Sequence, residues 1–290
     1  MDFSKLKGKS FYKNKFCNNK ELKVSILNHS LHFASSVFEG IRVYNAKPFL
    51  LGDHFQRLIN SSKIMQLDFK MPYKKFKLIT YKLIKLNKLK DGYIRPIVFR
   101  SSNSMSPDTS ECKTLFAMSC WKWPNLFNQK KGISLITSKW PKLNSEIYPI
   151  QAKSSGSYQC SVIDKVRSRK LGYDDSLILD LNKNVAETTA CNIFWITNKT
   201  VYTPSTKSIL NGITRKAVIK ICKQLNIKVI VGDYSLKNIM NSDTIFLSGT
   251  AAELQQINKI NKKKFKLENQ IFNRIKENFE ILKNRSPDYL

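Results

Sequence analysis

The stretch Gln151-Ala-Lys-Ser-Ser-Gly-Ser-Tyr158 places one lysine, Lys153, among small residues directly before a segment with helical character. A lysine that forms a Schiff base needs a lowered pKa and close packing against a flat ring. Small neighbours let such a ring approach the backbone. In a chain this rich in lysine, the competing interpretation is an ordinary solvated lysine. The choice between the two depends on the other segments of the sequence.

Glu187 is the second candidate, and it lies beyond an expected hairpin turn at residues 181–184. A carboxylate beside the pyridine nitrogen of a pyridoxal cofactor keeps that nitrogen protonated, which the ring needs in order to accept electrons. On spacing alone, an ordinary glutamate at a strand edge is the better interpretation.

Two glycine-containing segments could bind a phosphate through backbone N–H groups. Gly212-Ile213-Thr214 opens an expected helix, and helix N-termini attract anions. Gly249-Thr250-Ala251 follows an apolar strand and forms a second such turn. Arg57 could add a forked contact, although by itself it is an ordinary residue on the surface of a helix.

Five segments, in this order, closely resemble the fold-type-IV aminotransferases, which use pyridoxal 5'-phosphate, and within them the L-branched-chain amino-acid aminotransferases. They are Phe38-Glu-Gly-Ile-Arg42, Tyr93-Ile-Arg-Pro96, Ala152-Lys-Ser-Ser-Gly156, Asn211-Gly-Ile-Thr-Arg215 and Ser248-Gly-Thr-Ala-Ala-Glu253. The resemblance runs from about Leu27 to about Ile257. The first two segments resemble the branched-chain subgroup, because D-amino-acid aminotransferases and aminodeoxychorismate lyases usually differ there.

The resemblance implies a role for each candidate. Lys153 would hold the cofactor covalently, Glu187 would face the pyridine nitrogen and Tyr158 would bond the ring hydroxyl. The residues implied for the phosphate are Arg57, Ile213, Thr214 and Thr250. The residues implied for the substrate are Tyr93 with the Thr250 and Ala251 amides at its carboxylate, Arg95 in support, and Phe38 with Trp121 or Trp123 around its side chain. Met105 would reach that pocket from a neighbouring subunit.

One position departs from the family. Phe33 stands where relatives commonly have tyrosine, whose hydroxyl helps to hold the distal carboxylate of glutamate. The implied reaction transfers the amino group of leucine, isoleucine or valine to 2-oxoglutarate in two half-reactions, and Lys153 moves the Cα proton. We therefore expect glutamate and 2-oxoglutarate to bind less well than in the family.

The expected fold is α/β (α+β) with two domains, residues 1–125 and 133–290, a linker at 126–132, and the cofactor in the cleft between the domains. Helices are expected at 54–66, where Asp53 would be the cap, and at 73–89, 158–171 and 213–225. Strands are expected at 93–99, 114–120, 132–138, 176–180, 191–197, 227–231 and 244–247, with the strands at 176–180 and 191–197 paired.

Composition adds few constraints. The chain has 290 residues and a net charge of +29, but its lysines are spread along the whole length, so a nucleic-acid-binding protein is the weaker alternative. The six cysteines and three histidines show no metal or disulfide spacing. No membrane span or targeting peptide is expected, which predicts a cytoplasmic protein, and the family implies a homodimer or a larger homo-oligomer.

Overall fold

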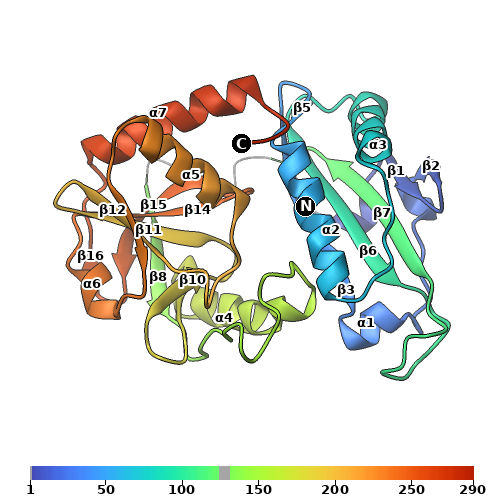
Figure 1. Cartoon of the computed structure of the whole chain (residues 1–290), viewed down its shortest axis with the longest axis horizontal. Helices are drawn as coiled ribbons and strands as arrows, with labels where there is room; N and C mark the ends of the chain where they lie inside the picture. The colour runs from blue at the N-terminus through green and yellow to red at the C-terminus, as the bar shows by residue number, and fades with distance from the viewer. Residues whose placement is uncertain (1, 124–130) are drawn as a thin grey trace. The chain divides into compact units, whose positions relative to one another are not determined.

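The computed structural model describes residues 2–123 and 131–290, which form two compact units (Figure 1). Unit 1 holds the described residues up to 123, together with Ala152–Gly156 and Lys283–Tyr289, and unit 2 holds most of the remainder. Both units combine helices with a sheet, as the expected α/β class requires. The expected domain limits stay a prediction, and most of the expected linker at 126–132 lies outside the described residues.

Unit 1 is built on a seven-stranded antiparallel sheet with the order β2-β1-β7-β6-β4-β5, and β3 also pairs with β6. Its elements are η1 (Phe3–Lys5), β1 (Lys9–Tyr12), β2 (Lys15–Asn18), η2 (Asn19–Glu21), α1 (His29–Phe33), β3 (Ser36–Phe38), β4 (Ile41–Tyr44), β5 (Lys47–Pro48), α2 (Leu51–Ile64), α3 (Tyr73–Leu86), β6 (Gly92–Arg100) and β7 (Thr114–Trp121). Helices α2 and α3 lie along the sheet (Figure 1), and their apolar side chains pack with it into one core.

The start of α2 corrects one expectation. Asp53 lies inside the first turn and is not the cap, because the helix begins at Leu51. Residues near the C-terminus take over the capping: the N–H of Gly52 donates to the carbonyl of Asp288 at 2.7 Å. The bare Cα of Gly52 also lies against the ring of Tyr289. Free N–H groups at a helix start need acceptors, and here they come from a distant part of the chain.

The end of α3 corrects another expectation. The helix ends at Leu86 and does not continue to Leu89. Asn87 stops it, because its side-chain amide accepts from the N–H of Lys9 at 2.7 Å and donates to the carbonyl of Lys9 at 3.0 Å. The contact ties the end of the helix to strand β1. The helix therefore ends earlier than its apolar pattern predicted, because of a hydrogen bond to a distant part of the chain.

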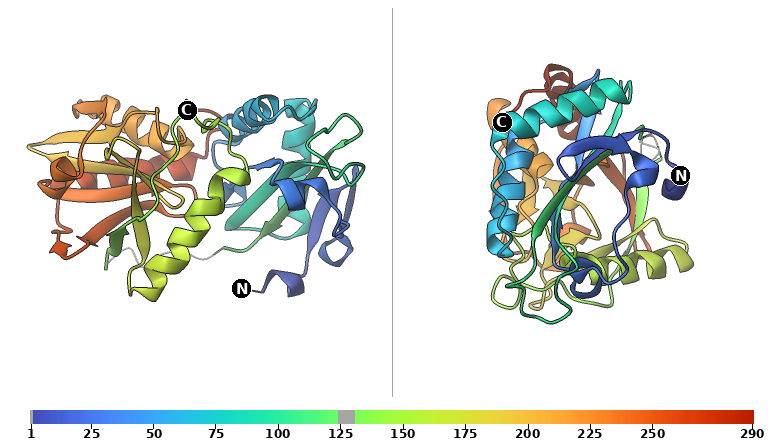
Figure 2. Two further views of the ribbon diagram at one scale, coloured as in Figure 1. Left: turned by 90° about the horizontal axis from the view of Figure 1, so that it is seen from below. Right: turned by 90° about the vertical axis from the view of Figure 1, so that its right-hand side faces the viewer.

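Unit 2 is built on a nine-stranded sheet with the order β10-β9-β8-β15-β14-β11-β12-β13, and β16 pairs with β15. Its elements are β8 (Ile133–Thr137), η3 (Gly156–Tyr158), α4 (Gln159–Lys170), β9 (Asp175–Leu179), β10 (Val185–Thr188), β11 (Asn192–Thr197), β12 (Thr200–Pro204), α5 (Ile213–Gln224), β13 (Val229–Gly232), α6 (Leu236–Met240), β14 (Thr244–Gly249), β15 (Glu253–Ile260), β16 (Lys263–Lys264) and α7 (Gln270–Arg285). Helix α4 packs on β9 and helix α5 on β14, on different sides of the unit (Figure 2).

Strand β10 was missed by the sequence analysis, and it changes the topology. The expected pairing of residues 176–180 with 191–197 is wrong, because β10 lies between these two strands and pairs with both. The path from β10 through β9, β8, β15, β14 and β11 therefore returns to β10, which closes the sheet on itself. The closing pair is Glu187 and Asn192, and β10 has an irregular register between Val185 and Glu187.

Within the described residues, no helix combines the length and the apolar character needed to cross a bilayer.

The core of unit 1 gives a stability prediction. Phe76 on α3 is fully buried, with its ring centroid 5.0 Å from that of Phe55. We expect Phe76→Ala to lower the free energy of unfolding in urea by about 3–5 kcal/mol, the usual cost of such a truncation. Leu78→Ala is the control on the same helix, because Leu78 is 68% exposed and should change little. Equal effects of the two substitutions would contradict this packing.

Candidate active site

Backbone pairing fixes Lys153 within unit 1. Its carbonyl accepts from the N–H of Phe38 at 3.1 Å, and its own N–H donates to Oγ of Ser61 on α2 at 3.0 Å. Ser154 bridges to Val37, and the N–H of Ser155 donates to the carbonyl of Ser36. The small residues around Lys153 thus pair with β3 through one bridge and its flanking hydrogen bonds, and they hold the backbone of the lysine in one place.

Phe38 brings the charged candidates of unit 1 together. The ammonium of Lys153 lies 5.1 Å from the centroid of the Phe38 ring, and the guanidinium carbon of Arg95 lies 4.7 Å from it. Arg95 also donates weakly to the hydroxyl of Tyr93 at 3.4 Å. Among the described residues, the buried Nε of Arg95 has no hydrogen-bond partner. The structure therefore places Lys153 and Arg95 beside the ring of Phe38, with Tyr93 next to Arg95.

Tyr93 is held by a close contact and by two tryptophans. A Cβ built on Gly40 would lie 1.6 Å from the Tyr93 hydroxyl oxygen, so only glycine fits there. The ring centroid of Tyr93 is 5.5 Å from that of Trp121 and 5.0 Å from that of Trp123. Both tryptophans thus border Tyr93, and the choice between them for the substrate side chain stays a prediction.

Arg57 belongs to a buried group that the sequence analysis did not identify. Its Nε and terminal nitrogen bond the two carboxylate oxygens of Glu39 at 2.5 and 2.8 Å, and His54 Nδ1 lies 2.7 Å from Glu39. Burial alone would raise the pKa of Glu39, but Arg57 and His54 hold it well below the usual range. Burial lowers the pKa of His54, which leaves its ring neutral. Glu39 therefore fixes the orientation of Arg57.

Glu187, in unit 2, also has a cation and a neutral donor as partners. One carboxylate oxygen lies 2.9 Å from the ammonium of Lys142, and the other accepts from the side-chain amide of Asn192 at 3.1 Å. The same amide nitrogen of Asn192 also bonds the carbonyl of Leu210 at 2.9 Å. Neither Lys142 nor Asn192 stood out in the sequence, because each becomes a neighbour of Glu187 only through strand pairing.

The start of α5 lies against the same amide. A Cβ on Gly212 would fall 2.0 Å from the side-chain oxygen of Asn192, so glycine lets this helix start approach the Glu187 group. Gly212 is the N-cap of α5, and having no side chain it supplies no capping oxygen. The first N–H groups, at Ile213 and Thr214, are therefore the kind that binds an anion.

Strand pairing connects the turn between β14 and β15 to Glu187 and Asn192. Ser248 pairs with Asn192, and Asn192 pairs with Glu187, so the three side chains share one face. Thr250 and Ala251 follow directly in the turn. The hydroxyl of Ser248 is buried and has no hydrogen-bond partner among the described residues. An orphaned polar atom beside the turn fits a site that takes a polar ligand.

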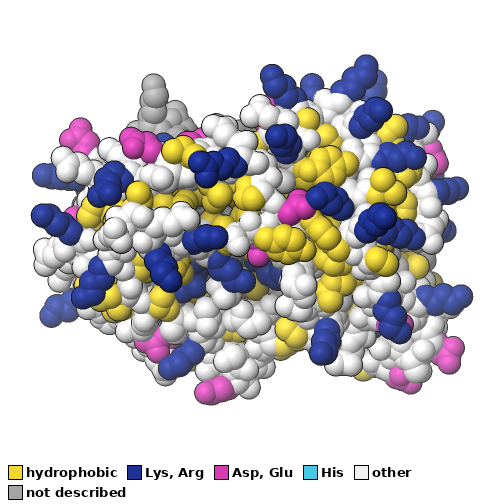
Figure 3. Space-filling model, turned by 45° about the horizontal axis from the view of Figure 1, so that its top comes forward, with side chains coloured by type: hydrophobic (Ala, Val, Ile, Leu, Met, Phe, Trp, Pro, Cys, Tyr) yellow, Lys and Arg dark blue, Asp and Glu magenta, His cyan; other side chains and the backbone are white. Residues whose placement is uncertain are grey.

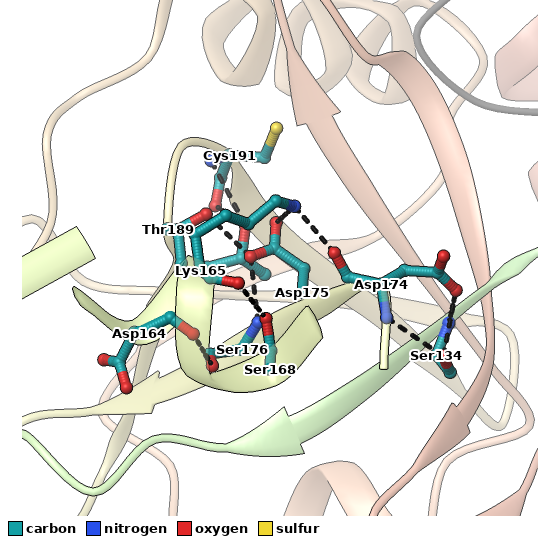
Figure 4. Close-up of polar contacts among 10 residues, drawn as sticks. Ser134, Asp164, Lys165, Ser168, Asp174, Asp175, Ser176, Thr189 and Cys191 are labelled. Atoms are coloured by element: carbon teal, nitrogen blue, oxygen red, sulfur yellow. Dashed lines mark hydrogen bonds and ion pairs between the residues drawn. The ribbon is translucent and has the colours of Figure 1, made fainter. Parts of the chain in front are cut away.

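A polar network fixes the elements that carry Tyr158 and Glu187 (Figure 4). Lys165 on α4 lies 3.3 Å from one oxygen of Asp175, and Thr189 donates to the other at 2.6 Å. Tyr158 is the N-cap of α4, and Thr189 follows directly after β10. One carboxylate thus ties both elements to β9. The ring-hydroxyl role of Tyr158 stays a prediction.

Phe33 and Met105 lie on the surface of unit 1. Each side chain is 44% exposed, and the ring of Phe33 stacks on His29 with centroids 4.6 Å apart. Their exposure leaves both side chains available to a ligand or to another subunit.

The chain resembles known proteins over most of its length. Residues 36–260 match the model of the family "Amino-transferase class IV". A probable branched-chain-amino-acid aminotransferase from Rickettsia felis is 39% identical over 265 residues, which cover 89% of each chain.

Two solved structures share the fold. The branched-chain aminotransferase of Thermoproteus uzoniensis with norvaline is 28% identical, has a TM-score of 0.93, and is matched over 98% of this chain and 97% of its own. The branched-chain amino acid aminotransferase of Escherichia coli is 29% identical, has a TM-score of 0.90, and is matched over 96% of this chain and 94% of its own.

The Glu39 group makes a stability prediction. Glu39→Gln leaves the guanidinium of Arg57, whose side chain is 13% exposed, without its counter-charge. Removing one partner of a buried ion pair costs about 3–5 kcal/mol, and we expect a loss of this size in urea unfolding. Asp68→Asn is the control, because it breaks an ion pair with Lys70 on the surface. If Glu39→Gln is as harmless as the control, Glu39 does not hold Arg57.

Proposed function

Because the chain belongs to the class IV aminotransferases and, within them, to the branched-chain amino-acid aminotransferases, we propose that it moves the amino group of leucine, isoleucine or valine to 2-oxoglutarate. The products are branched 2-oxo acids and glutamate, an exchange that serves amino-acid biosynthesis. The family match carries this proposal, because residues 36–260 contain Lys153 and all the residues to which we assign the cofactor.

The cofactor is pyridoxal 5'-phosphate, and the residues fit it. When bound, it supplies an electron sink for the Cα carbon. In this proposal Lys153 holds it covalently, Glu187 faces its pyridine nitrogen and Tyr158 bonds its ring hydroxyl. The phosphate is assigned to Arg57, Ile213, Thr214 and Thr250. The start of α5 at Gly212 and the partnerless hydroxyl of Ser248 within the described part of the chain support these assignments.

The residues of the chain then bind substrate and move protons. In this proposal the amine of Lys153 would take up the Cα proton of the substrate and give it back in the course of the exchange. Tyr93 and the amides of Thr250 and Ala251 receive the substrate carboxylate, and Arg95 supports them. Phe38 and one of the two tryptophans line the apolar part of the site. The ring contacts of Tyr93 and Phe38 described above support this division.

Rival functions have less support. The relatives that the chain resembles are branched-chain enzymes, so they do not support a D-amino-acid aminotransferase or an aminodeoxychorismate lyase. A panel of substrates separates the three activities. For a nucleic-acid-binding protein we would expect a dense basic patch, whereas Figure 3 shows lysines and arginines scattered across one face among other side chains.

We also propose a homodimer or a larger homo-oligomer, in which Met105 reaches the substrate pocket of a neighbour. Three apolar side chains on α4 support an assembly, because Val162, Ile163 and Val166 are each more than half exposed. The cytoplasmic location stays a prediction of the sequence.

The first test of the activity concerns Lys153. We expect Lys153→Ala to abolish transamination and the visible absorbance band of the lysine-bound cofactor, with an unchanged circular dichroism spectrum, because Lys153 is assigned both the covalent link and the proton transfer. Lys63→Ala, at an exposed lysine on α2, is the matched control and should retain both. Substantial activity in the folded Lys153→Ala variant would refute the central assignment.

A second test concerns specificity. Phe33 lacks the hydroxyl that would hold the distal carboxylate of glutamate, and a hydrogen bond to a charged group is worth about 1.5–3 kcal/mol. We expect Phe33→Tyr to lower KM for glutamate and 2-oxoglutarate and to leave leucine kinetics nearly unchanged. Phe33→Leu is the control without a hydroxyl and should not lower that KM. A change in leucine kinetics alone would mean that Phe33 has been misplaced.

A further inference from the structure

The ammonium of Lys142 is a contact of Glu187 that the proposed chemistry has not used. Its backbone lies beside the end of β9, where its N–H donates to the carbonyl of Leu179 at 2.8 Å and the residue bridges to Asp180. The side chain then reaches one carboxylate oxygen of Glu187 at 2.9 Å. Lys142 is thus held at its backbone by the end of β9 and at its ammonium by β10.

The ion pair is buried. The Lys142 side chain is 17% exposed and that of Glu187 is 9% exposed. Burial alone would lower the pKa of Lys142, but Glu187 raises it above its ordinary value, so the ammonium stays charged. A positive charge therefore lies within 2.9 Å of one Glu187 oxygen, in a place largely screened from water.

The two oxygens of Glu187 have different neighbours, and the difference matters for a proton. Asn192 is a neutral donor to one oxygen, whereas Lys142 places a full positive charge at the other. When a carboxylate and a pyridine nitrogen share one proton, a cation next to the carboxylate favours the state with the proton on the nitrogen. The reason is that the negative charge then lies next to the cation.

We propose that Lys142 is a positioning residue that orients Glu187 and places a positive charge beside it, so that the shared proton lies on the pyridine nitrogen of the cofactor. This inference rests on the proposed function, since it needs pyridoxal phosphate at Glu187. A purely structural lysine, which only ties its loop to β9, would not affect where that proton lies.

The decisive experiment measures the proton directly. The holoenzyme is loaded with pyridoxal 5'-phosphate labelled with ¹⁵N in the ring, and the ¹⁵N chemical shift reports whether the ring nitrogen is protonated. The variants are Lys142→Met, which removes the charge, and Lys142→Arg, which keeps it. Lys139→Met is the matched control, because Lys139 is exposed on the same loop.

We expect the wild type, Lys142→Arg and Lys139→Met to show a protonated ring nitrogen. Lys142→Met should shift the resonance toward the unprotonated form, as Glu187→Gln should. It should also lower kcat for leucine about 10-fold to 100-fold with little change in KM, a loss typical of groups that orient a ligating residue. In the double variant of Lys142→Met and Glu187→Gln, the second substitution should add little to the loss in kcat.

Two outcomes separate this inference from the function on which it rests. A protonated ring nitrogen and wild-type kcat in Lys142→Met would overturn the role of Lys142 and leave the aminotransferase intact. A wild-type protein that neither binds pyridoxal phosphate nor transaminates would instead overturn the proposed function. If Lys142→Met does not fold, Lys142→Gln removes the same charge and retains a polar end, and the same expectations apply to it.

Discussion

Closure of the unit 2 sheet at the pair Glu187 and Asn192 is the constraint on which the candidate site depends. A sheet that returns to its first strand has little freedom to shift its register, because a slip would move every side chain to the other face. The closure brings Glu187, Asn192 and Ser248 onto one face and sets the Asn192 amide against Gly212 at the start of α5. The carboxylate of Glu187 and the start of α5 are therefore positioned by the same pairing.

Each unit also buries a carboxylate, and the two carboxylates have the same kinds of partner. In unit 1, Glu39 lies between Arg57 and the neutral ring of His54. In unit 2, Glu187 lies between Lys142 and the neutral amide of Asn192. One cation offsets the cost of burying the charge, and one neutral donor occupies another lone pair. Both arrangements fix a side chain and give its two carboxylate oxygens partners.

The sequence predicted the features that depend on local pattern. The period of apolar residues located α2 and α3, and small residues around Lys153 indicated a close backbone approach. The failures share a cause, since Asp288 decides the start of α2 and Asn87 with Lys9 decides the end of α3. These contacts join parts of the chain far apart in sequence. Strand β10 was not predicted because it is short and because pairing with both of its neighbours, β9 and β11, defines it.

The same limit explains why Lys142 was overlooked. In a chain with 50 lysines and arginines, no local pattern distinguishes one ammonium from the rest. Lys153 could be singled out because small residues surround it in sequence, whereas the partner of Lys142 lies beyond helix α4 and strand β9. What separates these two from the exposed lysines is a partly buried side chain held against one particular neighbour, Glu187 for Lys142 and the Phe38 ring for Lys153. A charge acts on one chosen group only where the fold prevents it from turning toward water.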